Sequence, residues 1–241
     1  MTIPPMTPDD VLALLKEGNR RFLADEPYAP HTDRFSRLRM LAAQRPIAAY
    51  LSCSDSRVAP ELLFGRGLGE LFIIRNAGNS LCSTAIGSLE FAVSALQVPL
   101  IVVMGHENCG AVRAAVSVVR EHYSFSANIS KVLQPLYRAS MEFGAEEQHG
   151  LVTAAAMQKV RRVVRELQEE TSPAIRRPQQ HGRLKIVGAF YHLATGEIDW
   201  LDDPKARLLV NSRSGRAVVQ VPATSLMLGD GTIDPRQRLI R

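Results

Sequence analysis

The chain has 241 residues, of which 46% are apolar and 22% charged, and its formal net charge is +5. These values exclude a disordered chain, and the length favours one large α/β domain with additions. The sequence has no run of about 18 apolar residues, which excludes a membrane span. Its three cysteines are too few for a disulfide framework. Because the N-terminus also has no secretory signal pattern, we expect a cytoplasmic protein.

The excess positive charge lies in two segments. Residues 159–185 contain eight Lys or Arg against three acidic residues, and residues 202–241 contain seven against four. In the first segment, Arg161, Arg162 and Arg165 alternate with valines at helical spacing, which indicates the polar face of an amphipathic helix. We therefore expect no nucleic-acid partner, although a basic nucleic-acid-binding module with a structural zinc remains an alternative to an enzyme.

Residues 1–45 are predicted to form an N-terminal arm with one or two helices. Thr7 fits an N-cap position ahead of Pro8, and apolar residues then recur at helical spacing as far as Phe22. Residues 27–39 are rich in Pro, His and Arg, so we expect an irregular connection there.

From residue 46 onward, predicted strands and helices alternate. Apolar runs over 46–53, 71–77 and 100–106 are typical of strands buried on both faces of a parallel sheet. A fourth strand over 184–193 and a short fifth over 197–201 flank a Thr-Gly turn. Helices are expected over 83–97, 109–121 and 151–170. Residues 46–201 therefore predict an α/β domain with a covered parallel sheet.

Residues 202–241 break the alternation and are treated as a C-terminal extension of unknown role. Two short apolar stretches, 208–211 and 216–221, are separated by Ser and Gly residues. This pattern is compatible with a hairpin.

Residues with metal-binding and acid–base chemistry follow two of the predicted strands. The first strand ends at Cys53, which is followed by Asp55 and Arg57, and the third ends at His106, which is followed by Cys109. Parallel strands bring their carboxyl ends to one edge of the sheet. Two Cys and one His form an open catalytic zinc set with one free position. Arg57 is only four residues after Cys53, too close for a phosphatase loop, and the chain has no Cys-x-x-Cys pair.

Four motifs resemble those of the β-class carbonic anhydrases. They are CSDSRV at 53–58, FIIRNAGN at 72–79, SLEFAV at 88–93 and GHENCGAV at 105–112, and the resemblance extends from about residue 9 to residue 200. It implies a central four-stranded parallel β-sheet with an added antiparallel strand, flanking helices and one Zn²⁺ per chain. It also implies a homodimer joined by N-terminal helical arms, with a dimer of dimers as an open alternative.

The resemblance implies that Cys53, His106 and Cys109 are the zinc ligands and that Asp55 and Arg57 form a catalytic dyad. The implied reaction is the reversible hydration of CO₂ to bicarbonate and a proton by attack of a zinc-bound hydroxide. Two thiolates leave the zinc with no formal charge, so we expect its bound water to ionise at more alkaline pH than in a three-histidine site.

Four further positions match substrate-binding residues of the family. Gln44 matches a glutamine that hydrogen-bonds the substrate, and Phe72 and Ala77 match the wall of an apolar CO₂ pocket. Phe91 matches a position that the partner subunit offers to the site. Plain core packing remains the alternative for Phe72 and Phe91.

A related zinc hydrolase acting on carbonyl sulfide or carbon disulfide is the main alternative function. These molecules are linear and apolar, as CO₂ is, so the shape of the pocket would decide between them. The intact motif with Ser54 and Ser56 on either side of Asp55 favours CO₂.

Overall fold

The structure, a computed structural model, describes residues 6–26, 32–141, 151–169 and 172–201, together with the strand residues 209–210 and 217–218. Its helices are α1 (Pro8–Leu23), α2 (Arg34–Arg39), α3 (Pro60–Leu63), α4 (Ser83–Ser94), α5 (Gly110–Glu121), α6 (Ala127–Met141), α7 (Leu151–Gln168) and α8 (Pro173–Gln180). Its strands are β1 (Ala48–Cys53), β2 (Leu71–Asn76), β3 (Leu100–His106), β4 (Lys185–Tyr191), β5 (Ile198–Trp200), β6 (Leu209–Val210) and β7 (Ala217–Val218).

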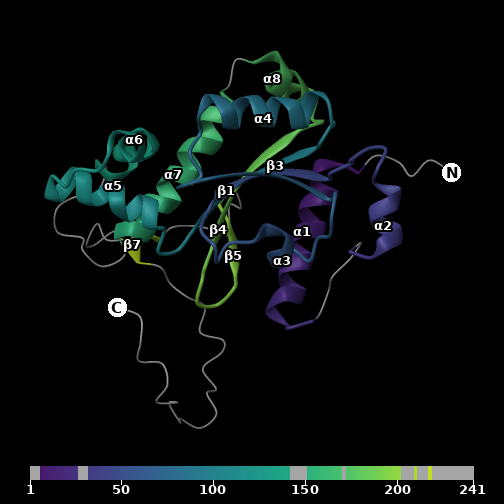
Figure 1. The fold of residues 1–241 in the computed structure, drawn as a ribbon, viewed down its shortest axis with the longest axis horizontal. Coiled ribbons are helices and arrows are strands. Elements are labelled where there is room, and N and C mark those ends of the chain that lie inside the picture. Colours follow the sequence, from purple (N-terminus) through teal and green to yellow (C-terminus); the bar gives the residue numbers. More distant parts are fainter. Residues whose placement is uncertain are drawn as a thin grey trace, which may run out of the picture. The chain divides into compact units, whose positions relative to one another are not determined.

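The first five strands form one sheet in the order β2-β1-β3-β4-β5 (Figure 1). Strands β1 to β4 pair in parallel, and β5 pairs antiparallel with β4. The expected four-stranded parallel sheet with one added antiparallel strand is thus confirmed. Because β1 and β3 are adjacent and parallel, Cys53 and His106 leave the sheet at the same edge.

Helices α4, α7 and α8 cover one face of this sheet, and α1 and α3 cover the other (Figure 1). On the first face, Leu51 and Val103 belong to an apolar core with Leu89 of α4 and Val160 of α7, and all four are fully buried. Burial of such side chains stabilises the fold by about 1.5–3 kcal/mol each. Helix α7 lies close to the sheet because Gly105 of β3 leaves room for Val160, which a Cβ there would approach to 2.7 Å.

Helix α1 is anchored on the other face by apolar and polar contacts. Leu15 is fully buried in a second core that includes Tyr50 and Phe64. The Asn19 amide Nδ2 donates to the carbonyl oxygen of Gly196, 3.0 Å away. These contacts tie the first helix to the turn between the last two strands of the sheet.

The expectation of an irregular connection over residues 27–39 is wrong for its last part. Helix α2 occupies Arg34–Arg39. Asp33 caps it, because its carboxylate accepts a hydrogen bond from the backbone N–H of Ser36 at 3.0 Å, and this supplies a partner for a helix-end donor. The sequence-based expectation rests on the Pro, His and Arg content of this segment and does not consider Asp33 as a helix N-cap.

Strand β2 is not buried on both faces as expected, since its residues are mostly half-buried. It is the edge strand of the sheet and, among the described residues, pairs only with β1, so one of its sides has no neighbouring strand. Helices α6 and α8 were also not expected. Each contains a proline, Pro135 in α6 and Pro178 in α8, which weakens a helical prediction.

Residues 1–203 and 204–241 are separate units. In the second, β6 and β7 pair antiparallel, as the expected hairpin requires. The other residues of the expected extension lie outside the described residues. Within the described part of the chain, no helix is both long and apolar enough to cross a membrane.

Candidate metal centre

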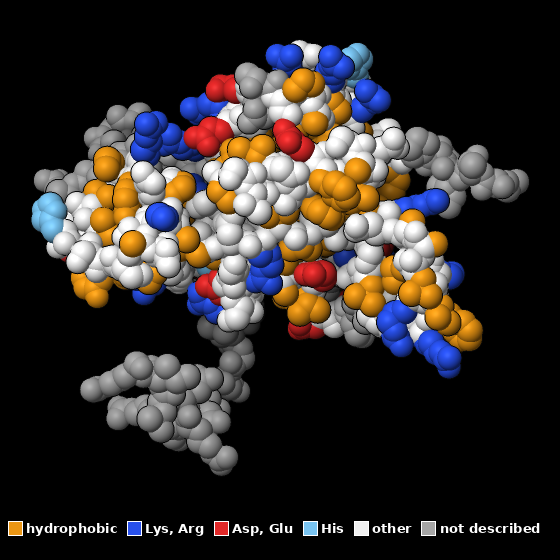
Figure 2. Space-filling model, turned by 45° about the horizontal axis from the view of Figure 1, so that its top comes forward, with side chains coloured by type: hydrophobic (Ala, Val, Ile, Leu, Met, Phe, Trp, Pro, Cys, Tyr) orange, Lys and Arg blue, Asp and Glu red, His pale blue; other side chains and the backbone are white. Residues whose placement is uncertain are grey.

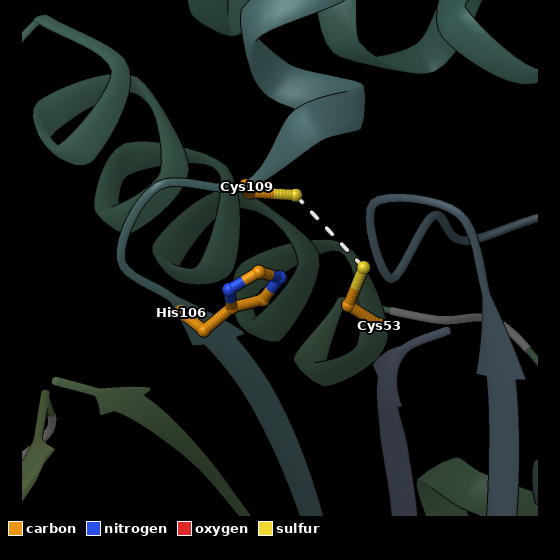
Figure 3. A group of neighbouring side chains, drawn as sticks. All are labelled: Cys53, His106 and Cys109. Carbon is orange, nitrogen blue, oxygen red and sulfur yellow. Dashed lines mark hydrogen bonds between the residues drawn. The ribbon is translucent and has the colours of Figure 1, made fainter. Parts of the chain in front are cut away.

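Three side chains with metal-binding atoms meet at the carboxyl edge of the sheet. Cys53 is the last residue of β1, His106 is the last residue of β3, and Cys109 is the N-cap of α5. Their ligand atoms all lie within 4.8 Å of one another, and the two sulfurs are 3.9 Å apart. Figure 3 shows the sulfurs facing each other with the imidazole turned toward them. The three residues are at most 5% exposed.

A tight turn between His106 and Cys109 brings these two residues together. Asn108 adopts a left-handed conformation with φ of 52°, which asparagine tolerates better than most residues. The backbone N–H of Glu107 donates to the carbonyl oxygen of Tyr191 at 2.9 Å, so the turn is held against the end of β4. The turn between His106 and Cys109 is therefore anchored to the end of β4.

The orientation of the His106 ring is set by its own turn. Nδ1 lies 2.8 Å from the carbonyl oxygen of Glu107, and since a carbonyl only accepts, Nδ1 carries the proton. Nε2 then carries a lone pair, and it is buried without a hydrogen-bond partner among the described residues. A buried, unpartnered nitrogen lone pair beside two sulfurs is the arrangement that a metal ion satisfies.

The surroundings of Cys53 favour its thiolate form. The Cys109 thiol donates to the Cys53 sulfur and holds the pKa of Cys53 well below its ordinary value, and a hydrogen bond from the backbone N–H of Gly78 adds to this lowering. The Gly78 nitrogen is 3.4 Å from that sulfur. The same thiol–thiolate hydrogen bond, together with burial, raises the pKa of Cys109. The two sulfurs therefore share one proton, which a divalent cation would displace.

Gly78 is required by the space and the backbone at this point. Its φ is +74°, and a Cβ there would lie 2.9 Å from Leu136 Cδ1 and 3.2 Å from the Cβ of Ala111. Both the conformation and the packing exclude a larger residue. The glycine thereby lets the chain pass close enough for its N–H to reach Cys53.

Asp55 and Arg57 form a two-point ion pair beside the cluster. Arg57 Nε and Nη2 donate to Asp55 Oδ1 and Oδ2 at 2.9 and 2.8 Å, and the Arg57 backbone N–H donates to Oδ1 at 3.0 Å. The pKa of Asp55 is lowered to about 2, mainly by the hydrogen bonds from the Arg57 side chain. Asp55 Oδ2 is 3.8 Å from Nε2 of His106, so an ionised carboxylate oxygen borders the three ligand atoms.

Arg75 supports this loop and was missed in the sequence. Its Nε donates to the carbonyl oxygen of Cys53 at 3.0 Å, and its Nη2 donates to that of Asp55 at 2.8 Å. These bonds fix the backbone on which both side chains stand. The available signal was a charged residue at the end of an otherwise apolar strand.

The donor set fits zinc. Two zinc–sulfur bonds of about 2.3 Å at a tetrahedral angle place the sulfurs about 3.8 Å apart, close to the 3.9 Å between the sulfurs of Cys53 and Cys109. Two thiolates and one neutral imidazole are the ligands of an open catalytic zinc site. The His106–Glu107 hydrogen bond supplies the outer contact that orients a metal-binding imidazole.

The four expected substrate residues occupy different positions around the sheet. Phe72 on β2 and Phe91 on α4 lie together, with ring centroids 6.1 Å apart, and Phe91 is 50% exposed. Ala77, directly after β2, and Gln44, between α2 and β1, are both exposed. The structure thus pairs the two aromatic residues and leaves Gln44 and Ala77 at the surface.

Comparison with known proteins identifies the family. The family model described as carbonic anhydrase matches residues 48–198. A carbonic anhydrase of Mycolicibacterium smegmatis is 38% identical over 197 residues, which cover 82% of this chain and 95% of that protein. The solved structure of a Coccomyxa β-carbonic anhydrase is 27% identical, with a TM-score of 0.60 over 79% of this chain and 86% of that one. The chain belongs to the β-class carbonic anhydrases.

The fold agrees with this membership. A tetrameric β-carbonic anhydrase from Sordaria macrospora superposes with a TM-score of 0.63 over 80% of this chain and 98% of that one, at 24% identity. The matched residues 48–198 contain the three clustered ligand residues and the Asp55–Arg57 pair. The resemblance seen in the motifs is therefore confirmed at the level of the family.

Proposed function

We propose that this protein is a zinc-dependent carbonic anhydrase that catalyses the reversible hydration of CO₂ to bicarbonate and a proton. One observation carries the proposal: in the described part of the chain the buried Nε2 of His106 has no hydrogen-bond partner, and it lies within 4.8 Å of the sulfurs of Cys53 and Cys109. Such a set binds one divalent ion and leaves one position for a reactant.

Cys53, His106 and Cys109 would hold one Zn²⁺ per chain. When bound, zinc acts as a Lewis acid that makes a water molecule nucleophilic near neutral pH. The chain keeps the ligands ready for it, because the Glu107 carbonyl sets the imidazole tautomer and the Gly78 N–H stabilises the Cys53 thiolate. Free thiolates persist in a reducing compartment, which supports the proposed cytoplasmic location.

Asp55 would orient the attacking oxygen by accepting a hydrogen bond at Oδ2. Its pKa of about 2 keeps it ionised at neutral pH, so it accepts a hydrogen bond without removing the proton. Arg57 acts through Asp55, since its two-point contact fixes the orientation of the carboxylate. Arg57 is therefore a positioning residue.

CO₂ would bind against apolar side chains, because it has no net dipole. Phe72, Ala77 and Phe91 are the proposed wall, and Gln44 is the proposed hydrogen-bond donor to the substrate. The half-exposed ring of Phe91 supports the view that a second copy of the chain completes this wall.

We further propose that the protein is a homodimer. Large apolar side chains are exposed on α2, directly after it and on α3, with Phe35 77%, Leu41 80% and Leu62 70% exposed. Figure 2 shows apolar side chains gathered on the side of the molecule that carries α2. Exposed apolar surface of this kind marks interaction sites, and a symmetric dimer would cover it.

Two measurements on one purified sample test the function. Metal analysis is expected to give one zinc per chain, and stopped-flow assays are expected to show CO₂ hydration that rises at alkaline pH. The same sample is then given carbonyl sulfide and carbon disulfide. Sulfide release faster than CO₂ hydration would contradict the proposal and identify a hydrolase with the same metal centre.

A further inference from the structure

A small cavity lies between α6 and α7, next to the loop that precedes α4. Its volume is about 150 Å³, and its lining includes Leu81, Arg138 of α6 and Lys159 of α7. Water occupies about 30 Å³ in the liquid, so the cavity holds a few waters or one small ion. It is too small for a nucleotide or a peptide side chain with its backbone.

Lys159 is an exceptional residue in this lining. It is 2% exposed, and its Nζ is buried without a hydrogen-bond partner in the part of the chain that the structure describes. Burial lowers the pKa of its ammonium group to about 7, while the charges of Cys109, Cys53 and Glu166 oppose that shift. An unpaired buried ammonium is unfavourable. Because the described residues provide no partner for Nζ, a bound anion would stabilise this group.

The charges around the cavity are unbalanced toward the positive. Arg162 is already paired, since its Nε donates to Glu166 Oε1 at 2.8 Å. Arg138 makes no ion pair with the described residues, and it faces the cavity from the other helix. With Lys159 protonated, the lining carries two cations that no carboxylate of the described residues pairs with. The Gln134 side chain, also in the lining, adds a neutral hydrogen-bond donor.

We propose that this cavity is a binding site for a small oxyanion, with Lys159 and Arg138 as its charged contacts. An oxyanion gives the buried ammonium a charge-assisted partner and matches the planar donors of arginine. The volume admits an ion of four or five heavy atoms, and bicarbonate and inorganic phosphate both have this chemistry.

The site is distinct from the metal centre. Its charged residues lie on α6 and α7, whereas the metal ligands lie at the ends of β1 and β3 and at the N-cap of α5. Lys159 senses the charges of both sulfurs but donates a hydrogen bond to neither. Binding in the cavity can therefore be measured without any catalytic readout.

The test is a thermal-stability titration of the zinc-loaded full chain at constant ionic strength, with phosphate, bicarbonate and chloride as separate probes. Lys159→Met removes the buried cation and keeps the length of the side chain. Lys131→Met, at an exposed position of α6, removes the same charge outside the cavity and is the matched control. Zinc content is measured for every variant, so that a change at the metal is recognised.

A bound oxyanion raises the melting temperature in a saturable way. We expect this rise in the unmodified protein and in Lys131→Met, its loss in Lys159→Met, and an affinity about tenfold weaker in Arg138→Gln. Stabilisation by only one of the two oxyanions supports the site and names its ligand. An unchanged rise in Lys159→Met, an equal rise with chloride, or no rise in the unmodified protein would overturn the proposal.

Discussion

The protein has two groups of buried polar side chains, the Cys53–His106–Cys109 cluster and the Lys159 cavity, and they favour ligands of opposite charge. Cys53, His106 and Cys109 bring two sulfurs and a lone pair to one point, a set that attracts a cation. Lys159 brings a buried ammonium to a cavity that also has Arg138, a set that attracts an anion. His106 Nε2 and Lys159 Nζ have no hydrogen-bond partner among the described residues, and the chemistry of each group decides which ligand fits.

The two groups also differ in how they are built. The metal centre is assembled from strand ends and turns, with backbone groups of Glu107 and Gly78 fixing its atoms. Lys159 lies on helix α7, and no hydrogen bond from the described residues fixes its Nζ. We therefore expect that few substitutions are tolerated at the metal centre, because backbone groups hold its side chains in place. The cavity should tolerate the loss of the positive charge of Lys159.

The largest expected effect comes from removing a metal ligand. Cys53→Ala leaves two of the three donors, so we expect loss of bound zinc and a fall in CO₂ hydration of at least about a thousandfold. Metal analysis and stopped-flow kinetics measure both. Cys82→Ala is the control, because Cys82 is an exposed free thiol and should keep both zinc and activity. Full activity in Cys53→Ala would contradict the assignment of Cys53 as a zinc ligand.

A smaller effect is expected from the dyad. Asp55→Asn keeps the size of the side chain but weakens the two-point contact with Arg57. Outer groups of this kind contribute about 10–100-fold to activity or metal affinity, and we expect that range for kcat/KM with zinc retained. If Asp55→Asn lost zinc as completely as Cys53→Ala, Asp55 would belong to the ligands and not beside them.

Lys159→Met should stabilise the protein and so sharpen the contrast with the metal centre. The folded pKa of Lys159 is about 7 and the unfolded value is about 10.4, so between these values the unfolded chain binds more protons and native stability rises with pH. We expect Lys159→Met to raise the free energy of unfolding by about 1–4 kcal/mol at pH 7.

The same gain should narrow as the pH approaches 10, where the folded-state amine is neutral in the unmodified protein. Urea unfolding at pH 7 and pH 10 measures it, in a buffer without oxyanions. A loss of stability at pH 7 would mean that the ammonium has a partner within the fold.

The smallest expected effect separates two glycines. Gly78→Ala forces a Cβ onto a residue with φ of +74° and against Leu136, so it should cost about 1–3 kcal/mol and weaken zinc binding. Gly87→Ala in α4 meets no atom within 4 Å and should stabilise the helix by about 0.5–1 kcal/mol. Chemical unfolding measures the free energy of unfolding of both variants. Equal changes would contradict the conclusion that the backbone and packing at position 78 require glycine.

The metal centre was predictable because its residues follow apolar strands directly. Cys53 and His106 end two runs that alternate with helical patterns, so their common edge follows from the rules for parallel sheets. The support by the Gly78 N–H could not be predicted, because it depends on a backbone path. The exposure of β2 also depends on strand order, which local patterns do not define.

Lys159 shows the limit of periodicity within a helix. The charged residues of α7 predict an outer face, and Arg161, Arg162 and Arg165 are indeed partly or largely exposed, while Val160, Val163, Val164 and Leu167 are buried. Lys159 lies one position before Val160, where the helical pattern is compatible with either side. Only the packing of α6 against α7 decides that it is buried.

The contact between Asn19 and Gly196 has a consequence for synthesis on the ribosome. The two residues are 177 positions apart, and chains grow at about 5–20 residues per second, so about 10–35 s separate their appearance. During that time the apolar side chains of α1, Val11 and Leu15, are already synthesised, but the sheet against which they pack is incomplete. Helix α1 is therefore synthesised well before the sheet on which it packs is complete, and it is among the last of the described elements to reach its final contacts.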